Sequence, residues 1–161
     1  MFLDAGHGGI DPGGIGETES GRRVAESEVN LPVELDTMQL LHADGFRVVV
    51  SRTKETTVAR LTSADLGDGV LSLQGSHHDV VARDVCANLS EARALVGIYM
   101  DAGDSTENAG SVSIFDAARP FSESNRKLAE FLQTDVVSAM DTKGWQIPND
   151  GIQSDASYVR R

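Results

Sequence analysis

Hydrophobic positions divide the first part of the chain into a strand, a helix and a second strand. Phe2 and Leu3 lead into a glycine-rich stretch, which predicts a short strand that ends in a loop over residues 6–16. Over residues 25–42, apolar residues recur every three or four positions, which predicts an amphipathic helix. Its apolar stripe comprises Leu31, Leu35, Met38 and Leu41. The run FRVVVS, residues 46–51, is β-branched and almost continuously apolar, as in a strand covered on both faces.

The rest of the chain continues this alternation of strands and helices. Residues 52–79 lack a clear period and predict a long loop, a feature that is usually functional or mobile in compact domains. Helices are expected over residues 79–92 and 121–140, and strands over 94–99 and 111–115. This order predicts an α/β fold, with a single domain, a mostly parallel twisted sheet and helices on both of its faces.

Composition narrows the classes of partner. The 161 residues are enough for one cored domain, and the formal net charge of −11 repels phosphate backbones and anionic membrane surfaces. We therefore expect no nucleic acid and no membrane as partners, and no apolar run reaches the roughly 20 residues of a membrane span. Cys86 is the only cysteine, so neither an internal disulfide nor a thiolate zinc cluster is expected.

His7 follows the first predicted strand directly, where functional groups gather in open α/β sheets. The glycine loop does not match a dinucleotide-phosphate motif, because Asp11 stands where the third glycine would be required. A metal interpretation fits better, since glycines allow a tight backbone and imidazole is a strong zinc ligand. Taken alone, however, a single histidine in a loop is more often a hydrogen-bonded residue than a metal ligand. Glu26 and Glu28 open the first helix, where acidic residues commonly complement the helix dipole.

Three sequence blocks carry a more specific resemblance. They are LDAGHGGIDPGGIG, ESEVNL, and VSRT together with RDVCANLSEARALVGIYMDA. The chain resembles the zinc-dependent N-acetylmuramoyl-L-alanine amidases, which cut peptidoglycan between the lactyl group of muramic acid and the first L-alanine of the stem peptide. The resemblance covers essentially the whole chain. It implies an amidase-like catalytic domain over residues 1–161, with a phosphorylase/hydrolase-like α/β fold and no second domain.

The resemblance also implies a metal site. His7 and Glu26 match two zinc ligands of the family, with Glu28 as a bystander. Tyr99 stands where the family has a second histidine, and a phenol, whose reference pKa is about 10, is a poor zinc ligand at neutral pH. His77 and His78, expected at the end of the long loop, are the alternatives for the third ligand.

The family's catalytic glutamate lies beyond a Y-x-V-L-R stretch that SYVRR, at the end of this chain, faintly resembles. We therefore expect the general base beyond the C-terminus, and a domain that is incomplete at both ends. Two functions follow from the sequence. The first is a peptidoglycan amidase that uses zinc-activated water, located outside the cell or in the cell wall or periplasm. The alternative is a non-catalytic amidase-like domain that binds cell-wall fragments or has lost its metal site.

Overall fold

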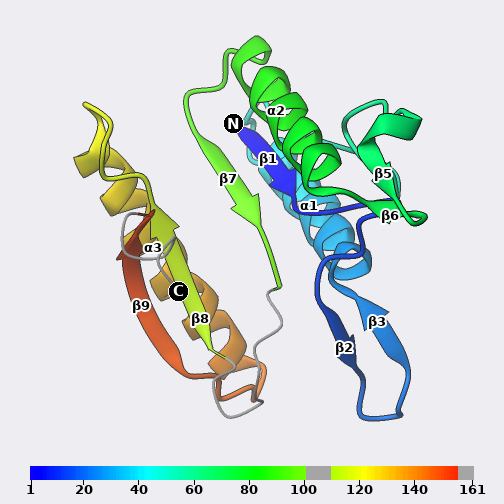
Figure 1. The fold of residues 1–161 in the computed structure, drawn as a ribbon. Coiled ribbons are helices and arrows are strands. Elements are labelled where there is room, and N and C mark those ends of the chain that lie inside the picture. Colours follow the sequence, from blue (N-terminus) through cyan, green and yellow to red (C-terminus); the bar gives the residue numbers. More distant parts are fainter. Residues whose placement is uncertain (101–109, 156–161) are drawn as a thin grey trace. The chain divides into compact units, whose positions relative to one another are not determined.

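The computed structural model describes residues 1–100 and 110–155, and Figure 1 shows their strands and helices. The chain divides into two compact units, within residues 1–102 and 103–161. Both units combine helices with parallel strand pairs, which confirms the predicted α/β class. That the chain forms one domain stays a prediction. Asp101 and the SYVRR segment, which contributed to the resemblance, lie outside the described residues.

The first unit is built around a three-stranded parallel sheet in the order β4-β1-β7. Its strands are β1 (Phe2–Ala5), β4 (Val49–Val50) and β7 (Leu95–Ile98). The central strand β1 is buried at every position, as its short apolar sequence predicts. The strand expected over 46–51 is much shorter than predicted, because only two of its residues pair with β1.

Two long helices lie on opposite sides of β1 (Figure 1). The first, α1 (Glu26–Ala43), agrees with the predicted helix to within one residue at each end. The second, α2 (Leu73–Leu89), begins six residues earlier than predicted. Ser72 explains the difference, because its hydroxyl accepts a hydrogen bond from the Gly75 amide at 3.1 Å and caps the helix there. His77 and His78 therefore lie within a helix, and their expected place in a loop is wrong.

The long-loop prediction for residues 52–79 is also wrong in part, because this segment contains short regular elements. They are a 3-10 turn, η1 (Ser63–Asp65), and an antiparallel pair, β5 (Leu66–Gly67) with β6 (Val70–Leu71). A second antiparallel hairpin joins β2 (Ile15–Glu17) to β3 (Arg23–Ala25), directly before α1.

The most deeply buried face of α1 is polar. Glu26, Asn30 and Glu34 recur every four residues and are all buried, whereas the predicted apolar stripe is only partly covered. The end of β1 supplies the partners of this polar face. The amide of Ala5 donates to the Glu34 carboxylate at 2.9 Å, and the Asn30 side chain donates to the carbonyl of Gly6 at 3.2 Å.

The second unit pairs β8 (Ser111–Phe115) in parallel with β9 (Asn149–Ser154), and α3 (Ser122–Thr142) packs on both strands. Gln133 joins the three elements, because its side-chain nitrogen donates to the carbonyl of Ser111 and to the side chain of Asn149, both at 2.7 Å. Strand β8 and helix α3 agree with the prediction, whereas β9 was not predicted. Among the described residues, no helix combines the length and apolar character needed to cross a membrane.

Candidate metal centre

His7 lies just beyond the carboxyl end of β1 in a strained but well-supported conformation. Its φ of 61° falls in the left-handed region, which residues other than glycine rarely adopt. Its Nδ1 lies 3.0 Å from a carboxylate oxygen of Asp11, and its Nε2 lies 3.3 Å from Oε2 of Glu26. The loop thus aims one ring nitrogen at the start of α1 while Asp11 holds the other.

Glu26 is the first residue of α1 and is only 5% exposed. Its Oε1 accepts hydrogen bonds from the Asn30 side chain at 3.2 Å and from the Met100 amide at 2.9 Å. Its Oε2 accepts from the Gly14 amide at 2.9 Å and faces His7. Glu28, by contrast, is exposed and lies 3.9 Å from Arg22. The structure therefore brings His7 and Glu26 together and leaves Glu28 on the surface.

Gly13 makes room for this pair. Its φ is 68°, and a Cβ atom added there would lie 2.5 Å from Cδ2 of His7 and 2.7 Å from Oε2 of Glu26. Such contacts are too short for any real side chain, so position 13 requires glycine for space as well as for backbone conformation.

This donor set fits zinc. Imidazole nitrogen and carboxylate oxygen are common ligands of the ion. Asp11 places a second carboxylate at Nδ1 of His7, the ring nitrogen that would not bind the metal. Such a carboxylate is the usual arrangement around a zinc-bound histidine. The two facing atoms, Nε2 of His7 and Oε2 of Glu26, are the groups that would hold the metal.

Tyr99 is the one candidate for the third ligand that contacts His7. Its ring meets the His7 ring edge-on, with centroids 5.8 Å apart and planes at 84°. It is half exposed and packs over Gly6, where an added Cβ would collide with the phenol ring. Position 99 follows β7 directly, so the phenol reaches the same sheet edge as His7.

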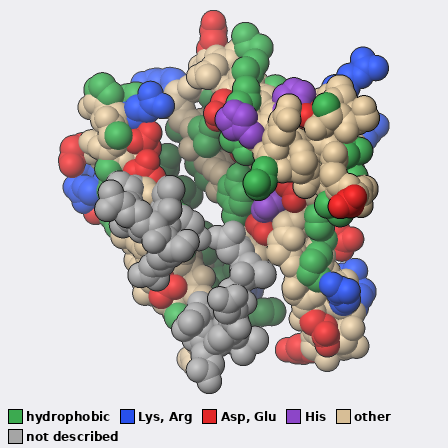
Figure 2. Space-filling model, in the orientation of Figure 1, with side chains coloured by type: hydrophobic (Ala, Val, Ile, Leu, Met, Phe, Trp, Pro, Cys, Tyr) green, Lys and Arg blue, Asp and Glu red, His purple; other side chains and the backbone are tan. Residues whose placement is uncertain are grey.

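His77 and His78 lie elsewhere in the first unit, near the N-terminal end of α2, and Figure 2 shows histidine side chains on the surface there. Nδ1 of His78 lies 3.2 Å from a carboxylate oxygen of Asp65 in η1. Both histidines line a separate hollow of about 460 Å³. Hydrogen bonds from the backbone and side chain of Thr62, with a further one from His78, lower the pKa of Asp65.

Within residues 1–100 and 110–155, no three His, Cys, Asp or Glu side chains converge on one metal position, so the third ligand stays a prediction.

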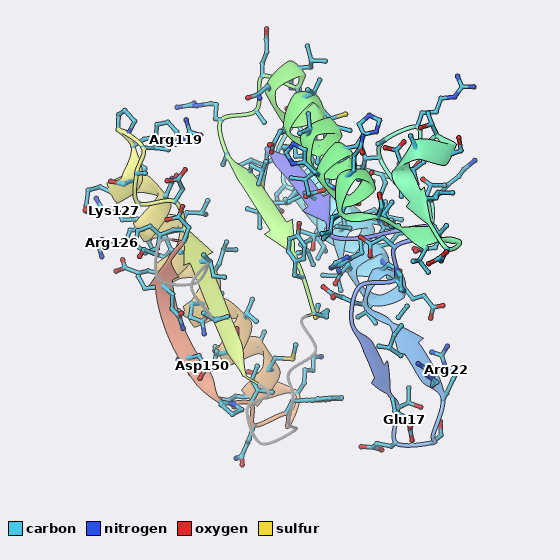
Figure 3. The ribbon with its side chains drawn as sticks, in the orientation of Figure 1. Glu17, Arg22, Arg119, Arg126, Lys127 and Asp150 are labelled. Atoms are coloured by element: carbon cyan, nitrogen blue, oxygen red, sulfur yellow. The ribbon has the colours of Figure 1, made fainter. Side chains whose placement is uncertain are left out.

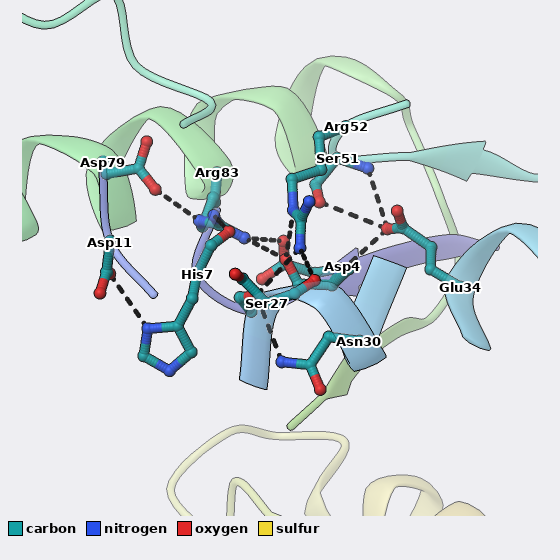
Figure 4. Close-up of polar contacts among 12 residues, drawn as sticks. Asp4, His7, Asp11, Ser27, Asn30, Glu34, Ser51, Arg52, Asp79 and Arg83 are labelled. Carbon is teal, nitrogen blue, oxygen red and sulfur yellow. Dashed lines mark hydrogen bonds and ion pairs between the residues drawn. The ribbon is translucent and has the colours of Figure 1, made fainter. Parts of the chain in front are cut away.

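Arg83 of α2 holds the His7 loop, a role that the residue pattern alone did not indicate. Its guanidinium donates to the carbonyl oxygens of Ala5 and His7, both at 2.7 Å, and to the carboxylates of Asp4 at 2.7 Å and Asp79 at 2.9 Å (Figure 4). Burial alone would lower the pKa of Arg83, but these carboxylates outweigh it and raise the pKa, so the group stays charged.

Arg52, two residues after β4, supports the same loop from another direction. It donates to the carbonyls of Ala5 at 3.2 Å, Gly6 at 3.3 Å and Ser27 at 3.0 Å. Each arginine is a long, planar donor that collects several carbonyl oxygens. Both arginines lie in the sequence blocks VSRT and RDVCANLSEARALVGIYMDA, so the family resemblance is the sequence signal that could have identified them.

The fold and the site define an α/β protein with a histidine and a buried glutamate facing each other at the carboxyl edge of a parallel sheet. The sequence matches the N-acetylmuramoyl-L-alanine amidase family over residues 1–161, and the chain belongs to this family.

Individual relatives agree with this assignment. The chain is 27% identical to N-acetylmuramoyl-L-alanine amidase LytC of Bacillus subtilis, over 99% of this chain and 26% of that protein. It is 26% identical to the germination-specific N-acetylmuramoyl-L-alanine amidase of the same organism, over 84% of this chain and 52% of that protein. The chain therefore spans about half, or less, of the length of these two relatives.

Solved structures show the same fold. The CwlD amidase from Clostridioides difficile, solved in complex with the GerS lipoprotein, matches 99% of this chain and 74% of its own, with a TM-score of 0.75 and 19% identity. The amidase AmiC2 of Nostoc punctiforme matches 99% of this chain and 71% of its own, with a TM-score of 0.65 and 24% identity.

Proposed function

We propose that this chain is a zinc-dependent peptidoglycan amidase that hydrolyses the amide between N-acetylmuramic acid and L-alanine, and that it acts at the cell wall. The observation that carries the proposal is the facing pair of His7 and Glu26, 3.3 Å apart, in a member of the amidase family. Zinc held by this pair would polarise the scissile carbonyl and supply an activated water.

The chain's own residues prepare the pair for this role. Asp11 accepts a hydrogen bond at Nδ1 of His7, which leaves the lone pair of Nε2 directed at Glu26. Asn30 and the Met100 amide occupy Oε1 of Glu26, so that Oε2 is the oxygen presented to the metal. We propose Tyr99 as the neighbour that completes the site, with His77 and His78 as the alternatives, and assign the general base to a residue beyond those described.

Zinc content tests the site directly. We expect the purified chain to retain about one zinc ion, measured by elemental analysis, and His7→Ala to lose it. His42→Ala is the matched control, because His42 is exposed at the end of α1 and should not affect zinc. Retention of zinc by His7→Ala would contradict the assignment of the ligand.

Activity is tested separately by labelling the new L-alanine amino groups that amide hydrolysis releases from peptidoglycan. We expect release by the wild type and by His42→Ala, and none by His7→Ala. Zinc bound through His7 without any release of L-alanine amino groups would favour the non-catalytic alternative.

A further inference from the structure

We propose that a groove between the β2–β3 hairpin and the first turns of α1 binds the L-alanine end of the stem peptide, an inference that rests on the proposed amidase function. The groove measures about 320 Å³ and reaches Glu26. Glu17 and Arg22 mark the far end of the hairpin (Figure 3). Because the groove ends at a proposed metal ligand, its occupant must be the part of the substrate next to the scissile bond.

The lining of the groove favours a small apolar residue. Its apolar side chains are Val24, Ala25, Val29 and Met100. Val29 and Met100 are 38% and 41% exposed and therefore have surface left to bury. The described residues that line the groove include no aromatic ring and no basic group. A sugar would place hydroxyl groups against these aliphatic side chains, which costs free energy wherever no hydrogen bond forms.

The charge of the groove points to the same occupant. Among the described residues, the charged groups that line it are the carboxylates of Glu17 and Glu26 alone, so an acidic side chain would be repelled. The methyl side chain of L-alanine carries no charge and matches the aliphatic wall. The groove thus fits the peptide side of the amide better than the glycan side.

Gly16 allows the groove to be filled without disturbing the fold. It pairs with Val24 across the hairpin, and residues paired in this way project on the same face. A Cβ at Gly16 would meet no atom within 4 Å, and its φ lies outside the left-handed region. A leucine at this position should therefore occupy the groove that Val24 lines.

The experiment compares Gly16→Leu with Gly67→Leu. Gly67 is a suitable control because it also lies in a short hairpin, and a Cβ there would have its nearest neighbour only at 4.0 Å. Binding of an unlinked stem peptide that begins with L-alanine, and separately of a muramic-acid disaccharide, is followed by NMR titration of the zinc-loaded chain. We expect Gly16→Leu to weaken peptide binding by about tenfold or more, with zinc content unchanged, and Gly67→Leu to bind like the wild type.

The outcomes separate this inference from the proposed function. Loss of peptide binding in Gly16→Leu supports the groove even if the chain hydrolyses nothing, in which case only the amidase proposal fails. Three results would overturn the inference, whatever the activity. They are equal peptide affinity in Gly16→Leu and the wild type, no peptide binding by the wild type, and NMR shifts of the groove residues that the disaccharide causes instead of the peptide.

Discussion

At the scale of single residues, His7 is fixed at three points. Its carbonyl accepts from Arg83, its Nδ1 contacts Asp11, and its Nε2 faces Glu26. These contacts offset the cost of a left-handed backbone at a non-glycine residue, which is of order 1–3 kcal/mol. The imidazole is therefore held in place before any metal arrives, as an effective metal site requires.

Gly13→Ala tests whether the space beside this pair matters. The added methyl group would overlap both His7 and Glu26, so we expect zinc affinity to fall by about tenfold or more, or about 1.4 kcal/mol. Gly45→Ala is the matched control. Its φ of 85° imposes the same kind of backbone strain, but an added Cβ there would meet no atom within 4 Å. Competition with a chromogenic zinc chelator measures both affinities, and equal affinities in the two variants would contradict the argument.

Only some of this residue-scale detail can be predicted from the sequence. The resemblance singled out His7 and Glu26, and the structure places them together, although zinc binding itself stays a prediction. The contact of Arg83 with the His7 carbonyl joins residues 76 positions apart. No local pattern encodes such a contact, because it depends on how α2 approaches β1.

At the scale of elements, α2 is tied to the end of β1 largely through Arg83. The side chain of Arg83 is 7% exposed, and the carboxylates of Asp4 and Asp79 that it pairs with are also buried. Removing a buried partner leaves uncompensated charges and typically costs about 3–5 kcal/mol. The helix therefore holds the loop that carries His7.

Arg83→Met tests this role of α2. Native-state hydrogen exchange measures the free energy of opening of the β1 amides. We expect this free energy to be about 3–5 kcal/mol lower in Arg83→Met than in the wild type. Arg22→Met provides the comparison, because Arg22 is exposed and its contact with Glu28 is long, at 3.9 Å. It should leave the exchange of β1 nearly unchanged. Similar protection of β1 in both variants would show that Arg83 does not hold the strand.

The elements themselves were predictable where their period is regular. Helix α1 carries apolar residues three to four positions apart from Leu31 to Leu41, and this spacing predicted that a helix forms there. The start of α2 depends instead on a cap at Ser72, ahead of a polar segment without a period. Strand β9, with the sequence NDGIQS, has no strand-like pattern and forms because β8 offers it a pairing edge.

At the scale of the whole molecule, the excess of acidic residues extends into the core. Asp4, Glu26, Glu34, Asp65 and Asp79 are all buried in the first unit. The predicted apolar core is thus partly replaced by a polar network, which hydropathy alone does not reveal. Most of these carboxylates have cationic or multiple donor partners, but Oε2 of Glu34 has no hydrogen-bond partner.

This carboxylate makes the stability of the first unit depend on pH. Burial raises the pKa of Glu34 above its ordinary value of 4.5, and the charge of Asp4 adds to the effect, although hydrogen bonds from Ala5 and Ser51 partly oppose it. Below pH 4.5 the group is protonated in both the folded and the unfolded chain. As pH rises through the raised folded-state pKa, the folded chain must ionise a buried carboxyl, so stability is lost.

Glu34→Gln should remove this loss, because glutamine keeps an acceptor for Ala5 and Ser51 but does not ionise. We expect the stability of the wild type relative to Glu34→Gln to fall as pH rises from about 4.5 to 8, measured by hydrogen exchange of β1 at matched intrinsic rates. Glu28→Gln, on the exposed face of the same helix, should show no such trend relative to the wild type. A constant difference in stability between the wild type and Glu34→Gln across this range would contradict the prediction, because Glu34 would then ionise as readily in the folded chain as in the unfolded one. In that case, the hydrogen-bond donors around Glu34 would be strong enough to cancel the cost of desolvating its carboxylate on the polar face of α1.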